Sequence, residues 1–225
     1  MSVTRNVTRL AIGATVLAAI ATASVALVAS AGASEGVAGV TIAARPSIAG
    51  PDHPITLFGT VRSGRPGEEI VIQTKDCGQS FFRTTTATRS QAGGHWATEF
   101  FPSIGTKVRA VWKRQASAPV TVGQRAMLRF APKASDRSQF VVSVVARAQF
   151  WRRSVVIERL DRQRGTWRAY RKVVLTNQEA PGEFVWTSGE FQARLPRGTM
   201  LRALLPQSQA GPCYLTSYSL SLRTG

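Results

Sequence analysis

The sequence has few of the side chains on which enzymatic and metal chemistry depends. Among 225 residues there are only 2 histidines, 2 cysteines and 12 acidic residues. Nucleophilic catalysis usually needs a histidine base beside the nucleophile. His53 stands in the rigid Pro51-Asp52-His53-Pro54 turn, and His95 opens an expected strand. Zinc and calcium need clustered ligands, which these scattered residues do not form. The sequence therefore predicts no catalytic residue, no metal site and no cofactor.

Motifs that would indicate an enzyme are also missing. There is no Gly-x-Ser-x-Gly nucleophile elbow and no phosphate-cradling glycine loop. Paired carboxylates could serve glycoside hydrolysis, but Glu68-Glu69 lies at a turn and strand edge, where solvated charge is the ordinary interpretation. Asp76, Glu158 and Asp161 stand among basic residues and are expected to form ion pairs. A small secreted all-β hydrolase remains the alternative from the enzyme class.

Long apolar runs are confined to the N-terminus. Leu10 to Val28 carries no charge, follows Arg5 and Arg9, and precedes the overlapping A-x-A sites within residues 29–33. This pattern predicts an export signal over residues 1–33. The run approaches the roughly 20 residues that span a bilayer, so an uncleaved anchor stays open. After cleavage we expect no membrane span, and a protein that is secreted or held at the cell surface.

The two cysteines, Cys77 and Cys213, lie in different halves of the chain. An exported chain meets an oxidising environment, in which two thiols can pair. Two free thiols in separate loops are the alternative, and the sequence does not decide between them. Neither cysteine has metal-ligand spacing to another cysteine or a histidine.

Charge is strongly unbalanced. The 29 Lys and Arg residues, less Arg5 and Arg9 of the signal, stand against 12 Asp and Glu and leave a mature charge of +15. Such a chain is attracted to anionic polymers, including teichoic acids, acidic polysaccharides, nucleic acid and lipid head groups. Arg outnumbers Lys 24 to 5, a bias that a GC-rich genome would also produce.

One stretch occurs twice. Thr106 to Trp112 returns as Thr199 to Leu205, 93 positions later, and both alternate apolar and other residues as half-buried strands do. Val108 and Leu201 fall on the expected inner face, and Arg109 points the other way. Arg202 does the same in the second copy. The repeat indicates that the mature chain uses one motif twice.

Short strands separated by turn signals fill the rest of the chain, with no helical periodicity after the signal. Six or seven strands at 8 to 12-residue spacing are typical of an all-β sandwich. We therefore predict two tandem β-sandwich domains, over residues 34–123 and 124–225, linked with almost no spacer near Val122 to Gln124.

Gly94-His95-Trp96, the Thr-x-x-Arg-Ala strand and the two similar halves resemble tandem immunoglobulin- or fibronectin-III-like modules of exported actinobacterial proteins, mostly uncharacterised. The resemblance covers about residues 40 to 223. It implies an extracellular, non-catalytic module, and it carries no site residues. The Cys–Trp–Cys core of antibody domains is absent, because each half holds one cysteine.

A basic, aromatic stretch between Arg147 and Lys172 is the one candidate binding site. Arginine forks grip phosphate, sulfate or carboxylate, and Trp and Tyr offer flat faces to sugars or bases. The predicted binding residues are Trp151, Arg152, Arg153, Arg162, Arg164, Arg168 and Tyr170. The alternative is that Trp167 is the core aromatic of the sandwich and the arginines cover solvated strand faces.

The sequence thus predicts a non-catalytic binding or spacer protein outside the cytoplasm, with an anionic polysaccharide or another cell-envelope polymer as its partner. A nonspecific nucleic-acid binder is a further alternative, because a +15 chain binds DNA with a steep salt dependence. No specific nucleic-acid partner is expected for an exported protein.

Overall fold

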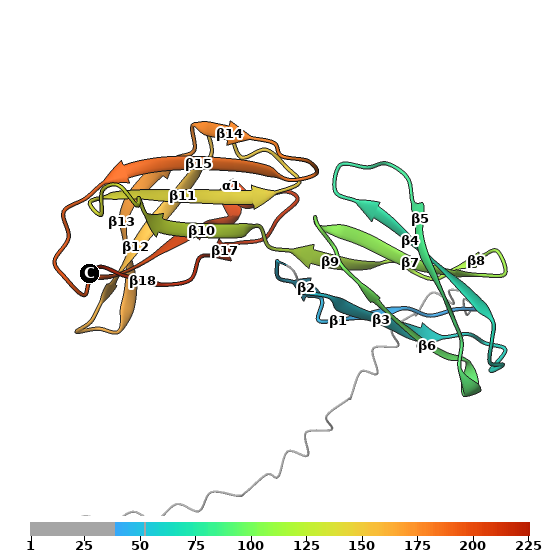
Figure 1. The fold of residues 1–225 in the computed structure, drawn as a ribbon. Helices are drawn as coiled ribbons and strands as arrows, with labels where there is room; N and C mark the ends of the chain where they lie inside the picture. Colours follow the sequence, from blue (N-terminus) through green and yellow to red (C-terminus); the bar gives the residue numbers. More distant parts are fainter. Residues whose placement is uncertain (1–38, 52) are drawn as a thin grey trace, which may run out of the picture. The chain divides into compact units, whose positions relative to one another are not determined.

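The protein is built almost entirely of β-strands, as the sequence predicts (Figure 1). The computed structural model describes residues 39–51 and 53–225. The predicted export signal lies outside these residues. Four sheets enclose two separate hydrophobic cores, with Val108 in one and Leu201 in the other.

The first sandwich has two sheets, and all pairings in them are antiparallel except β2 with β9. The smaller sheet has the order β1-β3-β6, with strands Ala43–Arg45, Ile55–Thr60 and His95–Phe100. The larger has the order β2-β9-β7-β4-β5, with strands Ile48–Ala49, Val120–Gln124, Thr106–Trp112, Glu69–Asp76 and Arg83–Arg89, and β8 (Gln115–Ala116) pairs with β7.

Side chains along β7 alternate between the core and the outer face of the sheet, as predicted. Val108 and Ala110 are fully buried, and the side chain of Arg109 lies on the other face. The motif around His95 also has a structural reason. Gly94 has φ +75°, and a Cβ there would lie 2.5 Å from the carbonyl oxygen of Val61. A glycine is therefore required at the turn that delivers the buried Trp96 into β6.

The second sandwich repeats this plan with antiparallel sheets. One has the order β10-β11-β15-β14, with strands Met127–Pro132, Gln139–Ala146, Val185–Gln192 and Asn177–Glu179. The other has the order β13-β12-β16-β17, with β18 also on β16, and its strands are Thr166–Val174, Ser154–Asp161, Met200–Leu205, Ser217–Tyr218 and Leu222–Arg223.

The core of the second sandwich is more aromatic than that of the first. Phe140 and Phe191 stack with 5.2 Å between ring centroids, and Phe150 lies 5.8 Å from Tyr214. Trp167, the alternative core aromatic, is only half-buried. Its ring lies against the guanidinium of Arg202, at 4.4 Å, on the outward face.

The two sandwiches share a bulge as well as a strand order. In the first sandwich, one residue of β5 is left unpaired opposite the step from Ile72 to Gln73 in β4. In the second, one residue of β13 is left unpaired opposite the step from Ile157 to Glu158 in β12, 85 positions later. The skipped residues are Thr85 and Tyr170, which are also 85 positions apart. This coincidence supports a motif used twice.

Helix among the described residues is limited to two short turns, which agrees with the lack of helical periodicity in the sequence after the signal. A 3-10 turn covers Ala92–Gly94 and α1 covers Gln207–Ala210. Four residues are too few to show a 3.6-residue period in the sequence. No described helix is long and apolar enough to cross a membrane.

The link between the sandwiches is short. β9 ends at Gln124 and β10 begins at Met127. Cys77 and Cys213 form a disulfide across 136 positions of sequence, with 5.4 Å between their Cα atoms. The two sandwiches are thus linked covalently in two places, once through the backbone and once through the disulfide.

Candidate functional site

A basic groove lies where β12, β13 and the loop before β16 meet. It has a volume of about 550 Å³ and is lined by four arginines and one aspartate. Three of the predicted binding residues line it: Arg162, Arg168 and Tyr170. The other two arginines are Arg159 and Arg197.

Some of the charged side chains in the groove already bond to other parts of the protein. Asp161 accepts backbone N–H bonds from Gln163 and Arg164, at 3.1 and 3.2 Å, and so closes the turn between β12 and β13. It also pairs with Arg168 at 3.3 Å. Arg162 donates to the carbonyl oxygen of Gly198, which ties this turn to the loop before β16.

The remaining charge of the groove faces solvent. Arg159 and Arg197 are exposed, and neither forms an ion pair with any described residue. Arg159 pairs directly with Arg168 across the strands, and like charges placed directly opposite each other are destabilising. The ion pair of Arg168 with Asp161 offsets part of this repulsion. The skipped Tyr170 stands beside the two arginines, 5.8 Å from the Arg159 guanidinium. Guanidinium groups of this kind can bind a carboxylate, sulfate or phosphate group.

The other predicted residues lie elsewhere. Arg164 is in the exposed turn after β12, next to the groove. Trp151 and Arg152 are in the turn before β12, with the guanidinium 4.2 Å from the ring. The eight residues of β12 separate the two turns by about 25 Å, at roughly 3.3 Å a residue.

Arg153 has a structural position. It donates to the carbonyl oxygens of Gln209 and Gly211, at the end of α1. Carbonyl oxygens at the C-terminal end of a helix accept no hydrogen bond from within the helix. A cation such as Arg153 is favoured there, because these oxygens carry partial negative charge. Arg153 is half-buried and lies over the ring of Phe150 at 5.2 Å. The predicted binding residues therefore fall into three groups: those in or next to the groove, the distant exposed pair Trp151 and Arg152, and Arg153 with its internal bonds.

Arg197 is the groove arginine that the sequence pattern does not indicate. It lies outside the basic stretch, in a Pro-Arg-Gly turn that carries no binding pattern of its own. Antiparallel pairing of β12 with β16 brings this turn beside the β12–β13 hairpin. A pattern that is local in sequence cannot report such a neighbour.

The expected ion pairs are found at two of the three acidic residues. Arg202 donates to Glu158 at 2.7 Å, and Asp161 pairs with Arg168. Asp76 instead accepts the hydroxyl of Thr106 at 2.7 Å, and it is in no ion pair among the described residues.

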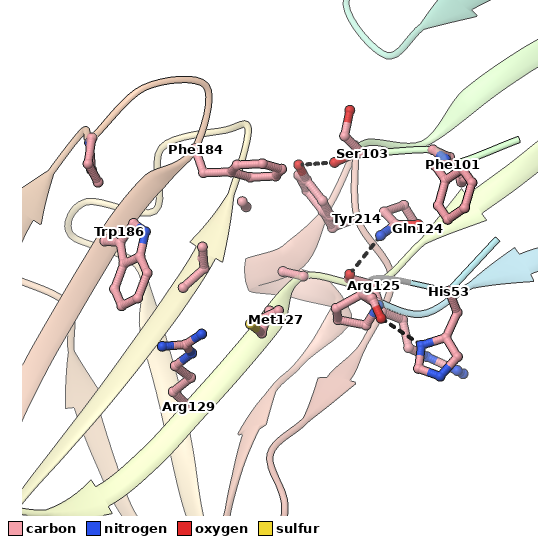
Figure 2. Close-up of a pocket in the computed structure, with 16 residues that line it drawn as sticks. His53, Phe101, Ser103, Gln124, Arg125, Met127, Arg129, Phe184, Trp186 and Tyr214 are labelled. Carbon is pink, nitrogen blue, oxygen red and sulfur yellow. Dashed lines mark hydrogen bonds between the residues drawn. The ribbon is translucent and has the colours of Figure 1, made fainter.

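An apolar pocket of about 320 Å³ lies beside the link between the sandwiches (Figure 2). Phe184 and Trp186 line one side of it and Phe101 with His53 the other. Arg129 stands 4.7 Å from the ring of Trp186. His53 makes a 2.6 Å contact with the carbonyl oxygen of Pro51, so its ring is used locally.

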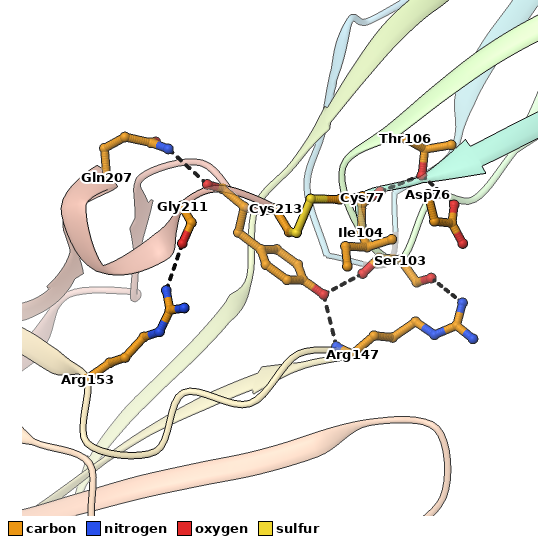
Figure 3. The surroundings of a disulfide bond; sticks show 11 residues. Asp76, Cys77, Ser103, Ile104, Thr106, Arg147, Arg153, Gln207, Gly211 and Cys213 are labelled. Atoms are coloured by element: carbon orange, nitrogen blue, oxygen red, sulfur yellow. Dashed lines mark hydrogen bonds between the residues drawn. A yellow bond between two sulfur atoms is a disulfide. The ribbon is translucent and has the colours of Figure 1, made fainter. Parts of the chain in front are cut away.

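Ser103 and Arg147 lie beside the disulfide of Cys77 and Cys213 (Figure 3). Tyr214, the residue after Cys213, connects these segments by hydrogen bonds. The Tyr214 hydroxyl donates to the carbonyl oxygen of Ser103 at 2.8 Å and accepts the backbone N–H of Arg147 at 2.9 Å. The backbone N–H of Gly105 donates to the carbonyl oxygen of Cys213 at 2.9 Å. Burial raises the pKa of Tyr214 above its ordinary value, because the ionised phenolate would lose its hydration.

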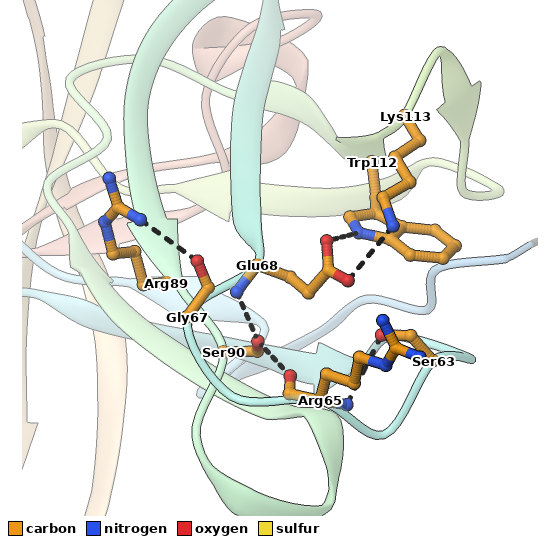
Figure 4. Close-up of polar contacts among 8 residues, drawn as sticks. All are labelled: Ser63, Arg65, Gly67, Glu68, Arg89, Ser90, Trp112 and Lys113. Atoms are coloured by element: carbon orange, nitrogen blue, oxygen red, sulfur yellow. Dashed lines mark hydrogen bonds and ion pairs between the residues drawn. The ribbon is translucent and has the colours of Figure 1, made fainter.

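Glu68 is not a solvated strand-edge charge, contrary to the sequence interpretation (Figure 4). It accepts the indole N–H of Trp112 at 3.1 Å and pairs with Lys113 at 3.0 Å. Its backbone N–H donates to Ser90 Oγ at 3.0 Å. Lys113 has φ 45°, and this left-handed turn after β7 returns the lysine toward Glu68. The hydrogen bond from Lys113, and then that from Trp112, lower the pKa of the Glu68 carboxyl.

We expect Glu68 to contribute to stability only when it is ionised. Because its folded-state pKa is lowered, the contribution is complete above the ordinary value of 4.5 and is lost as the pH falls through the folded value. Urea unfolding of wild type and Glu68→Gln should therefore differ at pH 7 and converge below pH 4.5. Glu69→Gln controls for the loss of one charge, and a gap that stays constant with pH would contradict the assignment.

The described part of the chain has neither a free thiol nor a cluster of metal ligands. Both cysteines are held in the disulfide, which leaves no thiol nucleophile. Within residues 39–51 and 53–225, no three His, Cys, Asp or Glu side chains stand close enough to hold a metal ion.

Comparisons with known proteins show no family for this chain. No protein-family model matches it, and no curated protein matches it. Among solved structures it is similar to the human OSCAR ligand-binding domain. That similarity has 14% identity and a TM-score of 0.28, and it covers 82% of this chain and 97% of that one. At so low a TM-score it supports no conclusion about function.

Proposed function

We propose that the protein is a non-catalytic binding protein that acts outside the cytoplasm, secreted or at the cell surface. Residues 1–33 act as its export signal, and residues 34–123 and 124–225 are its two sandwich domains. The groove lined by Arg159, Arg168 and Arg197 binds an anionic polysaccharide of the cell envelope.

The observation that carries this proposal is the meeting of cations from distant segments at one groove. Arg159 and Arg168 oppose each other across two strands, and Arg197 comes from a separate loop. Among the described residues, Asp161 provides the only negative charge that lines the groove, and it already accepts turn N–H groups. A polymer with repeated carboxylate or sulfate groups relieves the repulsion and offers sugar faces to Tyr170.

Retention on a heparin column tests the groove. Charge reversal of Arg159, Arg168 and Arg197 to Glu is expected to move elution to much lower salt. Arg62, Arg65 and Arg114, exposed in the first sandwich, provide a control triple with the same change in net charge. Equal shifts in both triples would show that total charge, and not the groove, governs retention.

A double-stranded DNA column run in parallel separates the polysaccharide from nucleic acid. Each ionic contact to DNA contributes roughly 0.9 to the slope of log affinity against log salt. We expect the groove triple to lose more retention than the control triple on heparin, and both to lose similar retention on DNA. A larger groove effect on DNA than on heparin would contradict the proposed partner.

A further inference from the structure

The apolar pocket of Figure 2 is built on an outward face of the sheet β10-β11-β15-β14. Met127, Val145 and Trp186 form one row across three strands. Their chain neighbours Leu128 and Val144 are buried in the core, so the row faces the opposite way. Outward strand faces that only contact water usually carry polar side chains, so a contiguous row of three apolar ones indicates a binding surface.

Aromatic side chains complete the walls and remain accessible. Phe184 is 42% exposed and Phe101 is 63% exposed, although both line the pocket. Pro51 and Pro102 are further apolar lining residues. The volume of about 320 Å³ is at the small end of the range of roughly 300 to 1,000 Å³ for ligand pockets. It suits one planar ring system better than a polymer.

An unused acceptor lies in the wall of the pocket. Gln124 is 5% exposed, and its Oε1 has no hydrogen-bond partner among the described residues. Its Nε2 donates to the carbonyl oxygens of Gly50 and Arg125, at 3.4 and 3.3 Å, which assigns the amide orientation. A buried acceptor without a partner is unfavourable, so a small rotation of the amide that brings Oε1 to the surface of the pocket would let a ligand N–H or O–H bond to it.

The charge of the pocket favours an anion. Arg125 and Arg129 line it, and no acidic residue does so among the described residues. Arg125 donates its Nε to the carbonyl oxygen of Thr216 at 3.2 Å. Arg129 forms no ion pair in the described part of the chain and stands over Trp186. A guanidinium beside an aromatic face can bind a carboxylate attached to a stacked ring.

We propose that this pocket is a second binding site, specific for a small planar aromatic carboxylate that also carries a hydrogen-bond donor. The ring lies against Trp186 between the phenyl rings of Phe101 and Phe184. The carboxylate pairs with Arg129, and the donor bonds to Gln124. The site is independent of the basic groove, since the two share no lining residue.

Isothermal titration calorimetry of the purified protein with three probes tests the site. Indole-3-acetate has the ring, the carboxylate and an N–H donor. Indole-3-acetamide removes the charge, and 1-naphthylacetate removes the donor. Each loss is expected to weaken binding by about tenfold or more. Equal affinity for the acetate and the acetamide, or no binding of the acetate at millimolar concentration, would overturn the proposal. Equal affinity for the two acetates would overturn the bond to Gln124.

Variants locate the binding. Trp186→Ala should weaken all three probes by about tenfold or more, and Arg129→Met should remove the preference for the acetate over the acetamide. Phe81→Ala and Arg164→Met are matched controls, since both side chains are exposed and neither lines the pocket. Unchanged affinities in Trp186→Ala and Arg129→Met would place the binding elsewhere and end the proposal. The groove triple should bind indole-3-acetate as wild type does, so this outcome is separate from that of the heparin test.

Discussion

Replacing both Cys77 and Cys213 with alanine is expected to lower the free energy of unfolding by about 5 kcal/mol. The bond closes a loop across 136 positions of sequence, and the chain-entropy model assigns this magnitude to a loop of that length. The effect is large because the linked residues belong to different sandwiches, so the bond restricts the unfolded chain over most of its described length.

Urea denaturation of the double variant and of oxidised wild type measures this effect. Wild type treated with a phosphine reductant is the control, and its unfolding curve should coincide with that of the double variant. The backbone bonds around Gly105 persist without the sulfurs, so the folded structure is expected to remain. A loss below about 1 kcal/mol would mean that the disulfide contributes little beyond these contacts.

Leu201→Ala and Ile72→Ala are expected to destabilise different halves of the protein. Both side chains are fully buried, Leu201 in the core of the second sandwich and Ile72 in that of the first. Removing such side chains costs about 2 to 5 kcal/mol, through lost burial and the cavity left behind. If residues 34–123 and 124–225 are separate domains, each substitution lowers only the unfolding transition of its own half.

The measurement is best made in the disulfide-free variant, where the halves can unfold separately. Scanning calorimetry should show two transitions, with Leu201→Ala shifting one and Ile72→Ala the other. Leu220→Ala, which truncates a side chain that is 91% exposed, is the control and should shift neither. A single transition that both core substitutions lower equally would show one cooperative unit and contradict the proposed domain division.

Much of the fold could be predicted because strand burial is a local property. Alternating side chains on a strand face opposite sides, so Val108 and Leu201 were placed correctly from spacing alone. The two similar halves followed from the repeated alternation. Short helical turns such as Gln207–Ala210 have no signature in the sequence, because four residues carry no measurable period.

The candidate sites were predicted only in part. Arg162, Arg168 and Tyr170 were found because they are near one another in sequence and on adjacent strands. Arg153 was included in the same stretch, but it donates into the end of α1, which no composition pattern shows. The sequence indicates a solvated Glu68, because its partners Trp112 and Lys113 come from a hairpin more than 40 positions away.

The alternation of side chains along each strand was sufficient to predict two β-sandwiches, since it depends on neighbours in the chain. Pairing of Cys77 with Cys213, the place of Arg197 in the basic groove and the apolar row of Met127, Val145 and Trp186 depend on which strands lie beside each other. That arrangement is set by contacts between residues far apart in sequence, which form only when the sheets are assembled.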